Sequence, residues 1–183
     1  LSAHIVHGNS LVADPSVDPH ALDWARAFPR VFEKGKPAGF DCVIGNPPWE
    51  RVKVQDREFF SLTDPVTAQA VSAAARKKRI AAMPTANAAL HESYLAARDR
   101  AQKMLDYARM PAKEGGRYPL TGKGDVNLYM LFAELASAIV APTGRVGLLV
   151  PSGIATDDTT KEFFNDLMDR KALVSLYDFE NKE

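Results

Sequence analysis

The 183-residue chain is 46% hydrophobic, which is enough apolar material for the core of one domain. Its 23 basic and 23 acidic residues cancel, so no overall positive charge indicates nucleic acid, although a local cleft can still be basic. No apolar run reaches the length of a membrane span, no signal peptide is evident, and a single cysteine excludes an internal disulfide. We therefore expect a cytoplasmic protein with no membrane partner.

The N-terminal part of the chain predicts a strand, a polar turn and a helix. Residues 3–6 have the pattern of a short strand, and Asn9 and Ser10 follow it. Small polar side chains at the end of a strand are suited to contact a nucleoside, and a plain turn is the alternative interpretation. Ala21 to Phe32 predicts a short amphipathic helix, which Pro29 interrupts.

Phe40 to Ile44 predicts a strand buried on both faces, because its apolar residues are consecutive. Cys42 lies inside this run and is therefore expected in the core. The next residues, Asn46, Pro47, Pro48 and Trp49, form a stiff loop, because two prolines fix their φ angles and lack backbone donors. In open α/β sheets, such a loop at the carboxyl end of a strand is where ligands bind.

The loop offers two acceptors and one flat ring. The side-chain oxygen of Asn46 and the carbonyl of Pro47 can both accept hydrogen bonds from one NH2 group. Trp49 can stack on a planar base or amide. An amine that donates two hydrogen bonds has a more nucleophilic lone pair, so this loop favours chemistry at an amino nitrogen. A simple turn with a core tryptophan is the alternative.

Residues 50–112 predict a helical insert in the sheet. Two helices, Val66 to Met83 and Ala86 to Met110, are expected to form a hairpin, with Pro84 in their connection. The first helix carries four consecutive basic residues, namely Arg76, Lys77, Lys78 and Arg79. These can contact DNA phosphates, or they can form a solvated helix face with its cations near the C-terminal end of the helix dipole.

A glycine-rich loop, Pro111 to Asp125, follows the insert. Its sequence from Thr121 to Gly124 lacks the spacing of a Walker motif, which excludes nucleotide hydrolysis of that type. A mobile loop near the substrate is the remaining expectation.

The C-terminal third predicts alternating helices and strands. Helices are expected from Asp125 to about Val140 and from Asp157 to Arg170, and strands from Arg145 to Val150 and from Leu173 to Tyr177. This order builds an α/β fold with a mostly parallel sheet and right-handed crossovers.

Residues 46–49 resemble motif IV of the S-adenosylmethionine-dependent amino methyltransferases, especially those acting on adenine N6 of DNA. Residues 127–129 and 144–151 are similar to motifs V and VI of the gamma-type enzymes, and residues 176–181 to a later segment of large restriction-modification and phage-defence relatives. The resemblance implies one partial methyltransferase domain over residues 1–183, with a Rossmann-like fold. It also implies that Asn46, Pro47, Pro48 and Trp49 are catalytic, that Trp49 contacts the base, and that Asn9, Ser10 and Asn46 contact the cofactor.

The glycine-bearing motif I that holds the methionine part of the cofactor is absent from this sequence. We therefore expect the middle of a methyltransferase domain, inactive by itself, in which the catalytic strand has lost a neighbour. Its exposed edge is expected to pair with another copy or to be covered by the N-terminal segment. The expected partner of the intact enzyme is double-stranded DNA, and no metal site is expected. The alternatives are methylation of RNA adenine or of protein glutamine, and a binding module with a degenerate methyltransferase fold.

Overall fold

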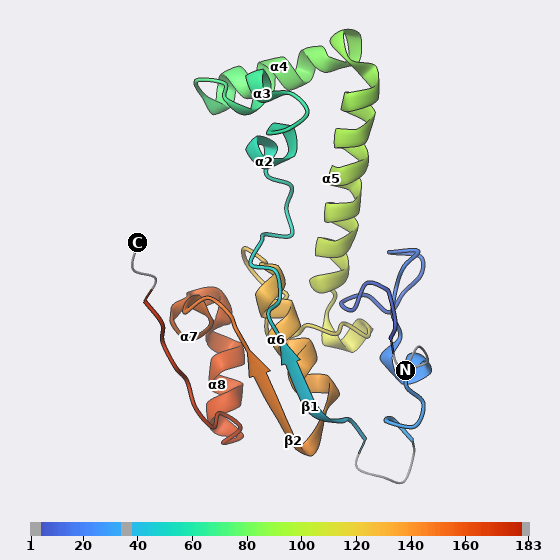
Figure 1. Cartoon of the computed structure of the whole chain (residues 1–183), viewed down its shortest axis with the longest axis vertical. Helices are drawn as coiled ribbons and strands as arrows, with labels where there is room; N and C mark the ends of the chain where they lie inside the picture. The colour runs from blue at the N-terminus through green and yellow to red at the C-terminus, as the bar shows by residue number, and fades with distance from the viewer. Residues whose placement is uncertain (1–4, 34–37, 181–183) are drawn as a thin grey trace.

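The computed structural model describes residues 5–33 and 38–180. In chain order, the elements are α1 (Trp24–Ala27), β1 (Phe40–Gly45), α2 (Asp56–Phe60), α3 (Pro65–Ala68), α4 (Ala73–Ala86), α5 (Ala88–Ala108), η2 (Ala112–Glu114), α6 (Leu128–Ile139), β2 (Val140–Leu148), α7 (Gly153–Thr156), η3 (Asp158–Thr160) and α8 (Lys161–Asp169). Two parts are visible in Figure 1. A body contains the sheet with α1, α6, α7 and α8, and a helical arm, α2 to α5, rises from it.

The sheet consists of β1 and β2, which pair in parallel as the sequence predicts. Their register runs from Cys42 opposite Arg145 to Gly45 opposite Leu148. It is irregular before Cys42, because residues 141–144 all lie opposite Asp41. An added Cβ at Gly144 would lie 2.6 Å from the carbonyl oxygen of Phe40, so only glycine permits this close approach.

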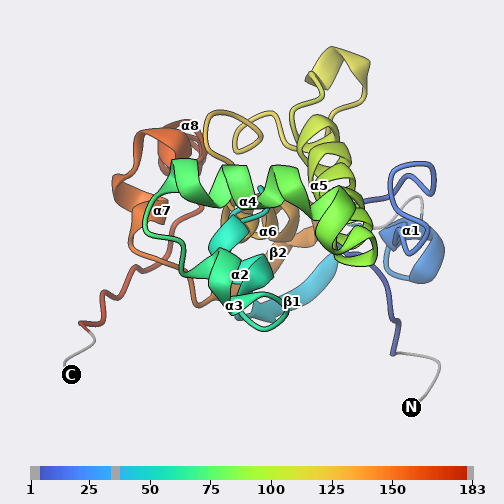
Figure 2. The ribbon, with the colours of Figure 1, turned by 90° about the horizontal axis from the view of Figure 1, so that it is seen from above.

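The prediction that β1 is buried on both faces is wrong. Val43 packs against the main core, whereas Cys42 is exposed and Ile44 is 82% exposed. Helices cover one face of the sheet only, as Figures 1 and 2 show. An apolar run indicates a strand, but it does not reveal how many layers cover that strand.

The body has two clusters of buried residues, both centred on α6. Its stripe of apolar residues contributes Leu131, Leu135 and Ile139 to the main cluster. Its other side packs Tyr129, Met130 and Ala133 against α7 and α8. Helix α6 therefore lies between the sheet and the remaining helices, as its predicted amphipathic pattern requires. Asn127 takes the N-cap position, although its side chain makes no capping hydrogen bond.

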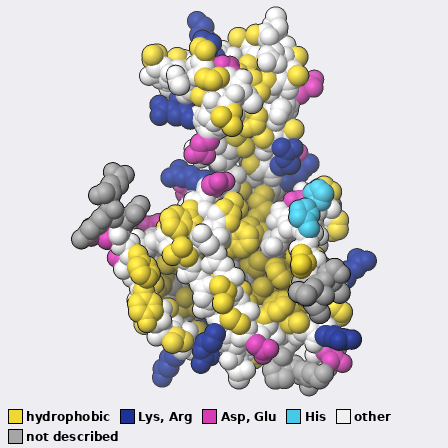
Figure 3. Space-filling model, in the orientation of Figure 1, with side chains coloured by type: hydrophobic (Ala, Val, Ile, Leu, Met, Phe, Trp, Pro, Cys, Tyr) yellow, Lys and Arg dark blue, Asp and Glu magenta, His cyan; other side chains and the backbone are white. Residues whose placement is uncertain are grey.

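The helical arm differs from the predicted hairpin. Helix α4 runs across the end of α5 instead of back along it (Figure 1). Pro84 lies inside α4, and the connection is made by Asn87, whose side chain accepts from the Leu90 N–H to cap α5. The arm has its own small core of four buried residues, Phe60, Ala68, Met83 and Tyr94. In the space-filling view the molecule narrows between arm and body (Figure 3).

Three further predictions need correction or lie outside the described residues. The helix predicted over Ala21 to Phe32 is much shorter in the structure, where only α1 forms. The final strand predicted over Leu173 to Tyr177 is absent, since residues 172–180 are extended without strand pairing. The predicted strand at residues 3–6 lies partly outside the described chain, and Ile5 and Val6 belong to no strand. Within the described residues, β1 pairs only with β2, so its other edge has no strand partner.

Candidate functional site: the loop after the first strand

Asn46 lies at the carboxyl end of β1, where its side chain is exposed. Within the described chain its amide makes no hydrogen bond, so both its donors and its acceptor remain free for a ligand. Pro47 is buried beneath it and Pro48 is exposed. Because the ring of the buried Pro47 fixes the backbone next to Asn46, the exposed amide of Asn46 is held on a rigid backbone.

Trp49 folds back toward the second strand. Its indole N–H donates to the carbonyl of Leu149 at 3.3 Å, and the Leu149 N–H donates to the carbonyl of Gly45 at 3.1 Å. The tryptophan is nevertheless 52% exposed. The ring is thus fixed at one edge while much of its surface remains accessible, which is the arrangement that stacking on a planar group requires.

The chain leaves this loop through a short antiparallel pairing. The Val52 N–H donates to the carbonyl of Val126 at 3.1 Å, and the Leu128 N–H donates to the carbonyl of Glu50 at 2.9 Å. An ion pair between Arg51 and Asp125, 3.0 Å long and largely exposed, accompanies it. The exit of the Asn46–Trp49 loop is therefore joined to the start of α6.

Asn9 does not present its amide to a ligand in the way the sequence predicts. Its side-chain oxygen accepts from the Leu11 N–H at 3.1 Å, and its NH2 group donates to Asp18 at 2.7 Å. That hydrogen bond, followed by one from the His20 N–H, lowers the pKa of the Asp18 carboxyl. The side chain of Ser10 makes no hydrogen bond with the described residues, although its carbonyl accepts from the indole of Trp24 at 3.0 Å. Of the three predicted cofactor contacts, Asn9, Ser10 and Asn46, Ser10 is thus more available than Asn9.

Residues 4–83 match the sequence model of the Eco57I restriction-modification methylase family. This similarity supports a methyltransferase of a restriction-modification system. The match spans less than half of the chain, yet it includes both Asn9–Ser10 and Asn46–Trp49. No curated protein and no solved structure shows significant similarity to the chain.

The basic run lies in the first half of α4, so the predicted position near the helix C-terminus is wrong. Arg76 is only 7% exposed, and its Nε and Nη2 atoms have no hydrogen-bond partner. Arg79 donates to the hydroxyl of Thr67 at 3.2 Å. Lys77 and Lys78 are exposed. Of the four basic residues, these two lysines are therefore the most available for contact with an anion.

A pocket of about 340 Å³ opens in the arm, with Asp64, Thr67, Arg79 and Asn87 among its lining residues. It lies between α3, α4 and the start of α5, and none of its residues belongs to the Asn46–Trp49 loop. The Asn46 side chain itself is exposed to solvent. No helix in the described ranges is long and apolar enough to cross a membrane.

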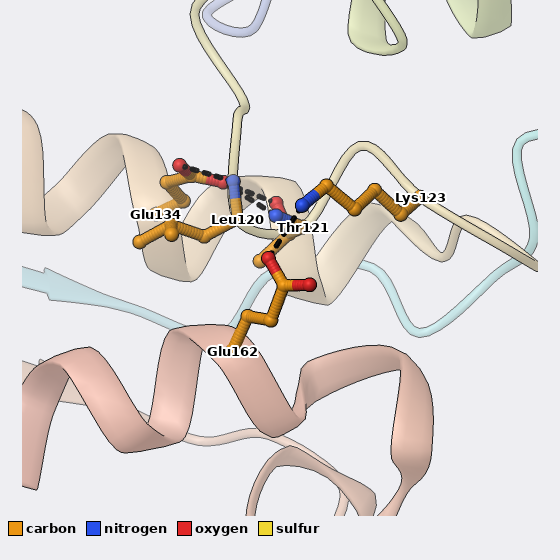
Figure 4. A network of polar contacts seen from close by, with 5 residues as sticks. All are labelled: Leu120, Thr121, Lys123, Glu134 and Glu162. Carbon is orange, nitrogen blue, oxygen red and sulfur yellow. Dashed lines mark hydrogen bonds and ion pairs between the residues drawn. The ribbon is translucent and has the colours of Figure 1, made fainter.

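The sequence did not reveal what fixes the glycine-rich loop. In the centre of this loop Tyr118, Thr121 and Gly122 are buried, whereas residues 111–115 and 123–125 are exposed. The carboxylate of Glu134 accepts hydrogen bonds from the loop (Figure 4). One signal was present, since Glu134 is the single acidic residue in an otherwise apolar helix.

Proposed function

We propose that this chain carries the methyl-acceptor site of a DNA methyltransferase that acts on adenine N6 in a restriction-modification or phage-defence system. The observation that carries the proposal is the free amide of Asn46 on a rigid loop beside the half-exposed ring of Trp49. The family match over residues 4–83 supports the class of enzyme. Adenine is favoured because the loop combines two acceptors for one amine with a flat surface for a base.

In this proposal, the residues of the loop act on the amine directly. The Asn46 side-chain oxygen and the Pro47 carbonyl accept one hydrogen bond each from the adenine N6 group. These bonds increase the electron density on the nitrogen and orient its lone pair. The ring of Trp49 stacks on the base, which has to be flipped out of the duplex because its amine is otherwise paired and stacked.

The methyl donor would be S-adenosylmethionine, which supplies an electrophilic methyl group. The described residues fit it in part. Asn46 is free to contact it, and the hydroxyl of Ser10 is unpaired, whereas the amide of Asn9 is occupied within its own loop. Asn9 would therefore not contact the cofactor. Its side chain would hold the turn in which Ser10 is available to the cofactor.

The arm provides a second contact with DNA. The strands point their carboxyl ends toward the arm, and α4 lies above that end of the sheet (Figures 1 and 2). DNA engaged by Trp49 would thus pass the exposed Lys77 and Lys78 on α4. Two lysines contribute affinity that is independent of DNA sequence and falls as salt concentration rises.

The decisive experiment compares Asn46→Ala with wild type, both in the intact enzyme, for methyl transfer from labelled S-adenosylmethionine to adenine in duplex DNA. We expect a loss of about 100-fold or more, because a hydrogen bond made to the reacting group is removed. Cys42→Ala, an exposed change on the same strand, is the matched control and should keep full activity. Full activity of Asn46→Ala would refute the role of this residue.

The same assay distinguishes other acceptors. RNA containing adenine and a peptide containing glutamine serve as parallel substrates. Transfer to either of these but not to DNA would replace the proposed substrate while keeping the role of Asn46. Calorimetric titration with S-adenosylmethionine tests the remaining alternative, since a degenerate binding module would bind no cofactor.

A further inference from the structure

We propose that Glu134 is a positioning residue for the Asn46–Trp49 loop, acting through residues 118–127, which we call the bridging loop and which lead into α6. The inference rests on the proposed function in one respect, namely that the Asn46–Trp49 loop binds the methyl acceptor. The contacts that carry it are independent of that function. They join a buried carboxylate on α6 to both segments predicted to contact ligands.

The carboxylate of Glu134 is buried, with the residue 6% exposed. One of its oxygens accepts from the Leu120 N–H at 3.1 Å, and the other accepts from the N–H and the hydroxyl of Thr121, at 2.8 and 2.6 Å. Figure 4 shows the side chain pointing from α6 into the loop. Three donors occupy both carboxylate oxygens, and no cation within the described residues forms an ion pair with Glu134.

The backbone of the bridging loop allows little other freedom. An added Cβ at Gly122 would lie 1.9 Å from the carbonyl oxygen of Ala108, so the loop presses directly against the end of α5. Gly124 has a φ of +63°, and its carbonyl accepts from Arg109 at 2.6 Å. A loop this tightly packed transmits a displacement at Thr121 to the residues that follow it.

The residues that follow are those that pair with the exit of the Asn46–Trp49 loop. Val126 and Leu128 form the hydrogen bonds with Val52 and Glu50 already described. Val126 and Val52 also belong to the same buried cluster. Because Glu134 fixes the bridging loop to α6, and the loop fixes residues 50–52, the direction in which the chain leaves Trp49 depends on Glu134.

The start of the bridging loop contacts the other predicted segment. The hydroxyl of Tyr118, which is fully buried, donates to the carbonyl of Leu11 at 2.6 Å. Leu11 directly follows Ser10, and its N–H donates to the side chain of Asn9. The bridging loop thus joins the Asn9–Ser10 turn at one end and the Asn46–Trp49 loop at the other, so Glu134 helps set their relative placement.

An amide cannot replace the carboxylate. In Glu134→Gln, the single side-chain oxygen can still accept from Thr121, but the new NH2 group then faces the N–H of Leu120. We expect the bridging loop to loosen without loss of the fold. Thr121→Val is a milder variant, since it removes only the hydroxyl donor and keeps the side-chain shape. Glu162→Gln is the matched control, because its partner Lys123 lies in the same loop but the pair is exposed.

The test is amide hydrogen exchange on wild type and the three variants, followed by thermal unfolding to verify the fold. For Glu134→Gln we expect exchange at Val52 and Leu128 to accelerate by about tenfold or more, with a smaller acceleration for Thr121→Val. The amide of Leu149, which bonds to Gly45 across the sheet, should not change in any variant, nor should Val52 in Glu162→Gln. Unchanged exchange at Val52 and Leu128 in both Glu134→Gln and Thr121→Val would overturn the proposal, as would a uniform acceleration that includes Leu149.

Methyl transfer then separates this inference from the proposed function. A positioning role predicts that Glu134→Gln lowers kcat of the intact enzyme by about tenfold, whereas the exposed control Glu162→Gln leaves kcat unchanged. If Asn46→Ala retains activity but exchange at Val52 responds to Glu134→Gln, the proposed function fails and the mechanical link stands. If Asn46→Ala abolishes activity and Glu134→Gln leaves both kcat and exchange unchanged, the function stands and the positioning role is wrong.

Discussion

The helical arm and the body are built on cores of different size. The body has two clusters of buried residues that meet on α6, and these reach the sheet, α8 and the C-terminal end of α5. The arm has one cluster, centred on Phe60 and Tyr94, and it also buries Arg76, whose Nε and Nη2 atoms have no hydrogen-bond partner among the described residues. A small core that contains an uncompensated charge opens at a lower free energy than a large apolar one. The arm can therefore change conformation while the sheet and its site remain folded.

The largest expected effect comes from removing a central side chain of each part. Phe60→Ala in the arm and Leu131→Ala in the body each remove a fully buried side chain, at a cost of about 3–5 kcal/mol. We expect Phe60→Ala to accelerate amide exchange in the arm only, while Leu131→Ala lowers the melting temperature of the whole protein. If Phe60→Ala also exposes the Leu149 amide, the two parts unfold as one unit.

Arg76→Met should increase the stability of the arm, whereas Phe60→Ala decreases it. Its guanidinium is buried without a hydrogen-bond partner, so an apolar side chain of similar length should stabilise the arm by about 1–2 kcal/mol. Denaturant unfolding followed by exchange in α4 measures this. Loss of stability, together with weaker DNA binding, would instead indicate that Arg76 swings outward to a phosphate.

A smaller effect is expected from pH. The hydroxyl of Thr67 donates to Asp64 at 2.5 Å and is the main cause that lowers the pKa of this carboxyl below its usual value of 3.8. A lowered folded-state pKa adds stability above the pKa of the unfolded chain, and this contribution disappears as the pH falls through the folded value. Protection of the arm's amides, corrected for the intrinsic pH dependence of exchange, should therefore fall below about pH 4, where unfolded aspartates protonate. Thr67→Val should reduce that dependence, and an unchanged profile would exclude Asp64 as its source.

The smallest effect on stability is expected from Lys77→Ala combined with Lys78→Ala. Both side chains are exposed, so unfolding should change by less than about 0.5 kcal/mol. Under the proposed function, the slope of log affinity for duplex DNA against log salt should decrease by about two. An unchanged slope would show that the arm does not contact phosphates through these lysines.

Local chemistry was predictable from the sequence, and long-range contacts were not. The loop after β1 was predicted correctly because two prolines fix its backbone wherever the chain places it. The strand predicted over Leu173 to Tyr177 is absent, because β propensity becomes a strand only when another strand pairs with it, and residues 172–180 have no such partner within the described chain. Ile44 is exposed for the related reason that no helix covers its face of the sheet.

The same distinction between local chemistry and long-range contacts applies to the candidate site. The exposed, unpaired Asn46 and the accessible ring of Trp49 are where the motif placed them, at the end of a strand. The occupied amide of Asn9 depends on Asp18, whose position is set by a turn that no periodicity reveals. Glu134 was missed because its three donors come from a loop that precedes it by more than ten residues.

The length of helix α5 sets the distance between the body and α4. Its 21 residues correspond to about 30 Å at 1.5 Å per residue, and one end lies in the core of the body while the other carries α4. That length is close to one turn of B-form DNA, or about nine base pairs. The number of residues in α5 would then determine how far along the duplex, measured from the flipped base, the arm makes its contacts. Under the proposed function, deleting two helical turns, about seven residues, would move those contacts inward by about three base pairs, which is about a third of a turn around the DNA axis.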